Sequence, residues 1–130
     1  MFTFIHAQII SKDGFDFQNQ AVSWVKENYP ETILFDFDNW SSAEIFQYAT
    51  QLTKEDSNTI ILIEKKAEEP AHSIATWLEK ILKHQVAIKI FIRGDDKFFK
   101  ILANKFPNQI MVVQENTAWQ DALKLLWNYK

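Results

Sequence analysis

Short stretches rich in β-branched and aromatic residues alternate with amphipathic stretches along the chain. The first kind predicts strands over residues 2–10, 32–36, 59–64, 87–93 and 109–114. The second kind repeats apolar residues at spacings of three and four, as Ile74, Leu78 and Ile81 do, and this spacing predicts helices. Five such helices are expected after the five strands, within residues 17–25, 45–52, 74–82, 98–102 and 119–126.

The boundaries of these elements carry residues that begin and end helices. Pro30 and Pro107 each follow a helical stretch and precede a strand, because proline cannot continue a helix. Ser41 followed by Glu44 is a capping box, which predicts a helix start. Strands alternating with helices predict a mostly parallel sheet covered on both faces. The expected fold class is therefore α/β, a three-layer α/β/α sandwich forming one domain over residues 1–130.

The order of the five strands stays open. In the flavodoxin-like order 2-1-3-4-5 the first and fourth strands are interior, and interior parallel strands usually read as unbroken apolar runs. The third strand fits this description, with the sequence TIILI. The first strand carries His6 and Gln8, however, and the fourth carries Lys89. These polar residues predict that the first or the fourth strand lies at an edge.

Composition places the chain among globular domains and excludes several functions. Apolar residues make up 47% of it, far from the composition of disordered segments. The net charge of -3 comes from intermixed acids and bases, which offer no field of one sign to nucleic acid. The absence of cysteine excludes disulfides, thiolate metal sites and a cysteine nucleophile. The first residues lack a signal-peptide pattern and no apolar run would span a bilayer, so we expect a cytoplasmic protein.

Glycine is too scarce for the common nucleotide-binding motifs. Dinucleotide and P-loop motifs need several glycines, because only glycine lets the backbone approach a phosphate closely. The chain has two, Gly14 and Gly94, and neither lies in such a motif. The G-x-S-x-G turn of α/β-hydrolases is also missing. We therefore expect no cofactor and no chemistry of the α/β-hydrolase kind.

Acidic residues near the ends of two predicted strands form a candidate metal site. Asp36 and Asp38 lie on one side of an extended chain, and Glu64 ends the third strand. Carboxylate oxygens are ligands that Mg²⁺ prefers, so these residues would support phosphoryl transfer or hydrolysis, with Asp95 or Lys65 assisting. The order 2-1-3-4-5 would separate the second and third strands by roughly 10 Å, too far for compact sharing of one ion.

A structural role is the alternative for these acids, and we favour it. Short polar side chains are common in turns and as helix caps. Asp38 or Asn39 would shape the turn before Ser41. Asp95 or Asp96 would cap the fourth helix.

Two further groups of polar residues are candidates. No pair of histidines has the spacing of a zinc-binding helix. His6 is expected to be packed and hydrogen-bonded, because catalysis by it would need an acid or base partner that the sequence does not locate. The loops after the first and third strands form a candidate ligand pocket, because ligands of open α/β sheets bind beyond the carboxyl ends of the strands. The candidate ligand-binding residues are Ser11, Lys12, Lys65 and Lys66.

The last predicted helix carries more apolar surface than one contact with a sheet needs. Its apolar residues cover an arc of about 200 degrees at the helical angle of about 100 degrees per residue. Because Trp and Tyr are favoured at interface cores, the excess predicts a docking surface. The candidate interface residues are Trp119, Leu125, Trp127 and Tyr129. A wrapped C-terminal segment is the alternative explanation.

The last third of the chain resembles a known family. The succession IKIFIRGDD, KFFKILANKF, QIMVV and TAWQDALKLLW looks like the end of STAS and SpoIIAA-like domains, which are small regulatory α/β modules. The strand TIILI and the helix after it depart from that pattern. The resemblance implies a regulatory role and assigns no site residue.

The missing catalytic motifs and the excess aromatic surface together predict a regulatory or protein-interaction module without catalytic activity. Its expected partner is another protein or a second copy of the chain, and neither nucleic acid nor a membrane is expected. Two alternatives stay open. One is a magnesium-dependent phosphoryl-transfer enzyme or hydrolase, and the other is a small-ligand-binding domain.

Overall fold

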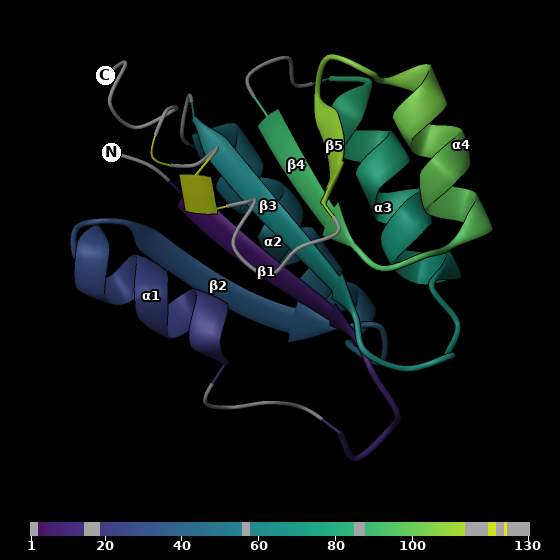
Figure 1. Ribbon diagram of the computed structural model, residues 1–130, viewed down its shortest axis with the longest axis horizontal. Coiled ribbons are helices and arrows are strands. Elements are labelled where there is room, and N and C mark those ends of the chain that lie inside the picture. The colour runs from purple at the N-terminus through teal and green to yellow at the C-terminus, as the bar shows by residue number, and fades with distance from the viewer. Residues whose placement is uncertain are drawn as a thin grey trace.

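Five parallel strands alternate with four helices in the computed structural model, which describes residues 3–14, 19–55, 58–84, 88–113, 120, 121 and 124 (Figure 1). The elements are β1 (Thr3–Ile9), α1 (Gln20–Asn28), β2 (Ile33–Asp38), α2 (Ala43–Glu55), β3 (Thr59–Lys65), α3 (His72–Leu82), β4 (Ile88–Arg93), α4 (Lys97–Lys105) and β5 (Ile110–Val113). The predicted α/β class and all five strands are confirmed. The described residues contain four helices rather than the five expected, because the predicted helix over 119–126 lies largely outside them.

The strand order is β2-β1-β3-β4-β5, and every neighbouring pair is parallel. The prediction that β1 or β4 lies at an edge is therefore wrong. Polar residues are tolerated in these interior strands because each finds a partner. His6 contacts Asp36 of β2 and Glu64 of β3, while the Lys89 ammonium donates to the Asn108 carbonyl over 3.0 Å. Many unrelated proteins share this order, so it implies no relationship.

The helices divide between the two faces of the sheet (Figure 1). Helices α2, α3 and α4 cover one face and enclose the larger apolar core, which includes Ile5, Ile63 and Leu78. Helix α1 covers part of the other face, where Val25 packs with Phe4 in a smaller core. Because side chains alternate along a strand, each strand supplies residues to both cores.

Short polar side chains set the ends of several elements. Asn19 begins α1, since its Oδ1 accepts from the backbone N–H groups of Ala21 and Val22. Asp96 caps α4 by accepting from the Phe98 N–H over 2.9 Å, as predicted. The structure thus assigns these two side chains the ordinary capping role of Asn and Asp.

The loop between β2 and α2 differs from its prediction. Asp38 Oδ1 accepts from the Trp40 N–H over 2.7 Å, which confirms the expected turn. The prediction of a capping box at Ser41 and Glu44 is wrong. The Ser41 hydroxyl accepts from the Asp38 N–H and so belongs to the turn before the helix. Helix α2 begins two residues later, at Ala43.

Candidate functional site

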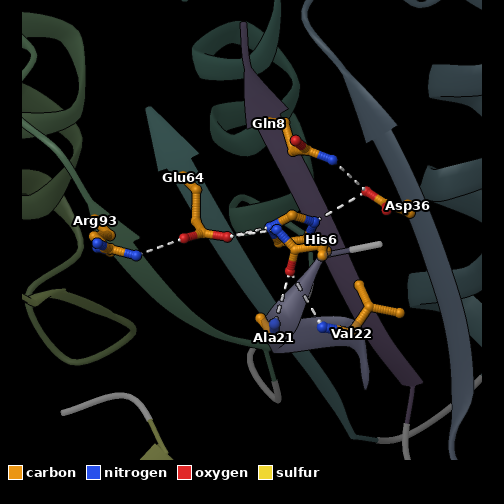
Figure 2. Close-up of polar contacts among 8 residues, drawn as sticks. His6, Gln8, Ala21, Val22, Asp36, Glu64 and Arg93 are labelled. Atoms are coloured by element: carbon orange, nitrogen blue, oxygen red, sulfur yellow. Dashed lines mark hydrogen bonds and ion pairs between the residues drawn. The ribbon is translucent and has the colours of Figure 1, made fainter. Parts of the chain in front are cut away.

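Four charged side chains form a continuous row across β2, β1, β3 and β4 (Figure 2). This polar row consists of Asp36, His6, Glu64 and Arg93, in that order. It lies on the α1 face, towards the carboxyl ends of the strands. The parallel register places His6 beside Asp36 and Glu64 beside Arg93. The charges alternate in sign along the row once His6 is protonated.

The imidazole of His6 is fully buried between two carboxylates. Its Nδ1 lies 3.0 Å from Asp36 Oδ1 and its Nε2 lies 2.6 Å from Glu64 Oε1. Each nitrogen faces a carboxylate oxygen, and both nitrogens can donate at once only when the ring is protonated. Burial alone would lower the pKa of His6, but the hydrogen bonds and charges of Asp36 and Glu64 outweigh burial and raise it.

Glu64 is the most connected member of the polar row. Its Oε1 accepts from His6 and, over 3.2 Å, from the Asn19 amide, while its Oε2 accepts from Arg93 Nη1 over 2.9 Å. Burial acts to raise the pKa of Glu64, but His6, Asn19 and the charge of Lys66 lower it to about 2. The side chain is therefore a carboxylate at neutral pH, held in one position by three donors.

A pocket of about 780 Å³ opens where the polar row ends, beyond the carboxyl ends of β3, β4 and β5. We call it the rim pocket. Its lining residues are Glu64, Lys65, Lys66, Arg93, Gly94, Asp95, Lys100, Val112 and Val113. Open α/β sheets place their ligands at this end of the strands. Two members of the polar row, Glu64 and Arg93, therefore also form the floor of a cavity with the size of a ligand site.

One wall of the rim pocket is fixed by Lys65. Its side chain is 9% exposed, and its ammonium donates to the Asp95 carbonyl over 2.9 Å and pairs with Asp96 over 3.3 Å. Gly94 lies against it with φ of 128°, and a Cβ at that position would come within 2.6 Å of Lys65 Cβ. Only glycine fits there, because both the space and the backbone angle exclude a side chain. Lys65 thus joins the loops that follow β3 and β4.

The three predicted metal ligands do not converge. Asp36 and Glu64 lie on opposite sides of the His6 ring, and Asp38 accepts from the Trp40 N–H in its own turn. In the part of the chain that the structure describes, no group of three His, Asp or Glu side chains is placed to hold a metal ion. The magnesium-site prediction therefore gains no support from the described residues.

The predicted ligand-binding residues divide into two pairs. Lys65 and Lys66 line the rim pocket, as part of the segment that leaves β3. Ser11 and Lys12 are exposed at the turn after β1 and are not part of its lining. The predicted interface residues Trp119, Leu125, Trp127 and Tyr129 lie outside the described residues.

Several residues of the site were not predicted from the sequence. Arg93 is the last residue of a strand. A position at the end of a strand is the signal that identified Glu64, and it would have identified Arg93 as well. Lys100 lies on a helix and carries no such signal. Asn19 is recognisable as a helix cap, but its contact with Glu64 spans 45 positions and cannot be seen in the local pattern.

No family model, curated protein or solved structure matches the chain. The resemblance of its last third to STAS-like domains thus gains no support from these comparisons. Among the described residues, no helix is both long and apolar enough to cross a membrane. The cytoplasmic location stays a prediction.

Proposed function

We propose that the protein is a small-molecule-binding domain whose ligand occupies the rim pocket. The observation that supports this most directly is the pocket itself, which has the volume and the position expected of a ligand site. Charged groups and the apolar side chains of Val112 and Val113 line it together. Ligand sites typically combine such apolar walls with a few fixed polar groups.

The polar row supports the proposal because it fixes the floor of the pocket in advance. Glu64 accepts hydrogen bonds from His6 and Asn19, which fix its position. It also accepts one from Arg93, which lines the pocket. Glu64 is only 6% exposed, so solvent has little access to these bonds. A ligand that meets groups already in place loses less free energy to ordering them.

The test is to fill the rim pocket and ask whether ligands are lost. Val112 lines the pocket and is 45% exposed, so Val112→Trp would block it without disturbing the core. Met111 is 51% exposed and outside the lining, which makes Met111→Trp the matched control. Metabolites would be screened by thermal shift and by NMR chemical-shift mapping. We expect hits that V112W loses and M111W keeps.

Two outcomes of this screen would contradict the proposal. Hits that bind V112W and the unchanged protein equally well would place the ligand elsewhere. A broad metabolite screen without any hit would leave the pocket without a ligand function. In either case the protein would not be a small-molecule-binding domain of the kind proposed.

Protein–protein interaction, the function that the sequence favours, is a second candidate. A group of exposed apolar side chains lies along the β2 edge of the sheet and on α2: Ile33 at 38%, Ile45 at 38% and Tyr48 at 54% exposure. Tyr48 also contacts Phe35 of β2, with ring centroids 4.9 Å apart. Edge strands present backbone groups that can pair with another strand. The occupant we propose is a second copy of the chain, because edge-to-edge pairing about a two-fold axis needs no other partner.

The oligomeric state decides this second candidate. Light scattering coupled to size exclusion should show a dimer that Tyr48→Ser with Ile45→Ser converts to a monomer. A monomer already in the unchanged protein at high micromolar concentration would exclude pairing through this surface.

A further inference from the structure

We propose that the ligand of the rim pocket carries an oxyanion, either a carboxylate or a phosphate, and that Arg93 and Lys100 bind it. This inference rests on the proposed small-molecule site and adds the chemical class of the ligand. The charges that line the pocket, their partners and their exposure carry the argument.

Two of the charges in the lining already have partners beneath the surface. Lys65 pairs with Asp96, whose side chain is 12% exposed. Glu64 is buried and pairs with the buried His6 imidazole. The charge of Lys65 is offset by Asp96, and that of Glu64 by its basic neighbours. These two pairs stabilise the walls of the pocket and contribute little to the electrostatic potential inside it.

The remaining charges of the lining are mainly positive. They are Lys66, Arg93 and Lys100 against a single acid, Asp95. The full chain has a net charge of -3, so this is a local reversal of sign in an acidic protein. A concave site lined by one sign of charge concentrates ligands of the opposite sign.

Arg93 has the geometry to bind an oxyanion directly. Its Nη1 donates to Glu64 over 2.9 Å, and the side chain remains 39% exposed at the pocket. A guanidinium carries five N–H donors in a planar fork that matches carboxylate and phosphate oxygens. Glu64 therefore acts as a positioning residue, because it fixes one side of the guanidinium.

Lys100 reaches the same pocket from α4, and its present partner is easily exchanged. Its ammonium lies 2.8 Å from Asp95 Oδ1, with side-chain exposures of 67% for Lys100 and 81% for Asp95. An ion pair this exposed contributes little to stability because solvent screens it. A ligand oxyanion can replace the Asp95 carboxylate at small cost. The apolar side chains of Val112 and Val113 then face the organic part of the ligand.

The experiment compares charged and neutral probes of the same shape. Phenyl phosphate, benzoate, neutral benzamide and inorganic phosphate would be titrated into the full chain and followed by NMR. We expect phenyl phosphate or benzoate to shift the resonances of Gly94 and Val112, and benzamide to leave them unchanged. The dissociation constant should rise about tenfold in Lys100→Gln, the change expected for losing one charged contact. The phosphate and carboxylate probes decide between the two kinds of oxyanion.

Matched variants keep folding separate from binding. Lys105→Gln removes a charge of 52% exposure from the same helix, outside the pocket, and should leave the dissociation constant unchanged. Arg93→Lys keeps the charge, loses the fork and should weaken binding. Benzamide binding as tightly as benzoate, or equal affinity in K100Q and K105Q, would overturn the inference while leaving the small-molecule site intact. If every probe bound V112W as tightly as it binds the unchanged protein, the proposed function itself would be overturned.

Discussion

The two faces of the sheet differ in chemistry although the same strands supply both. On the face covered by α2, α3 and α4, the middle parts of the three central strands β1, β3 and β4 are apolar. Seven side chains there are at most 1% exposed: Ile5, Ala7, Ile9, Ile61, Ile63, Ile90 and Ile92. On the α1 face, β1 and β3 begin apolar and end polar. In β1, for example, Phe4 is followed on that face by His6 and Gln8.

The two faces of the sheet therefore contribute to the protein in different ways. The apolar face stabilises the fold by burying hydrocarbon, which needs no directional partners. The polar row on the other face has to satisfy each charge with another, because an unpaired charge in the interior is costly. Removing a side chain should therefore have consequences of a different kind on each face.

Removing the central charge of the polar row should have the largest effect. Glu64→Gln leaves the buried His6 cation and Arg93 without their shared carboxylate. Breaking a buried ion pair in this way costs about 3–5 kcal/mol of the free energy of unfolding. Urea denaturation monitored by circular dichroism measures the loss.

The control for this variant is Glu68→Gln, since the Glu68 side chain is 92% exposed and pairs only at the surface with Lys65. Its free energy of unfolding should stay close to that of the unchanged protein. A similar loss in both variants would mean that burial of the row contributes nothing special to stability.

A truncation on the apolar face should cost slightly less and should not depend on pH. Ile61 is fully buried in the larger core, on the same strand as Glu64. Ile61→Ala should lose about 3 kcal/mol through lost burial and the cavity left behind, and Ile61→Val about 1 kcal/mol. Denaturation at several pH values tests this. If the decrease in the free energy of unfolding varied with pH as strongly in I61A as in E64Q, the two faces would not differ in the way proposed.

The elements of this fold could be predicted from local pattern, but the order of the strands could not. The strand β2 was expected over residues 32–36 and is found at Ile33–Asp38. The order depends on contacts between distant residues, such as His6 with Glu64, which are 58 positions apart. The rule that interior strands are unbroken apolar runs placed β1 or β4 wrongly at an edge, because it ignores sites at the ends of strands.

The candidate site was predicted in part. Asp36 and Glu64 were selected as acids at strand ends, which is a local signal. Their partner His6 was expected only to be packed and hydrogen-bonded, because sequence cannot show that its strand lies between theirs. The sequence therefore suggested a metal site only as the less favoured alternative to a structural role, whereas the structure places the His6 imidazole between the two acids.

The difference in stability between the unchanged protein and E64Q should vary with pH as the charges of the polar row predict. The pKa of His6 is raised in the folded protein, so its contribution is complete below its ordinary pKa of 6.5 and is lost as the pH rises through the folded value. The pKa of Glu64 is lowered from 4.5 to about 2, so its contribution is complete above 4.5 and is lost as the pH falls towards 2. The free energy of unfolding of the unchanged protein should therefore exceed that of E64Q by the largest amount between pH 4.5 and pH 6.5.

This profile can be measured by urea denaturation at intervals across the pH range, with the unchanged protein and E64Q in parallel. I61A serves as the control, since it keeps every titrating group and should follow the unchanged protein at a constant offset. A difference between the unchanged protein and E64Q that stays constant across this range would contradict a charged His6 in the row.

The smallest of these effects is expected at Asn19, whose side chain both caps a helix and contacts the polar row. Its Oδ1 caps α1, and its Nδ2 donates to Glu64 over 3.2 Å. Asn19→Ser keeps a capping oxygen but is too short to reach Glu64, so it should lose about 1 kcal/mol for the hydrogen bond. Asn19→Ala loses both and should cost about 2 kcal/mol. Urea denaturation of both substitutions, made in the unchanged protein and in Glu64→Leu, separates the two contributions, because leucine offers Asn19 no acceptor whereas glutamine would keep one. Asn19→Ser should be nearly neutral in the Glu64→Leu background, and an undiminished loss there would show that Asn19 acts as a cap and not as part of the row.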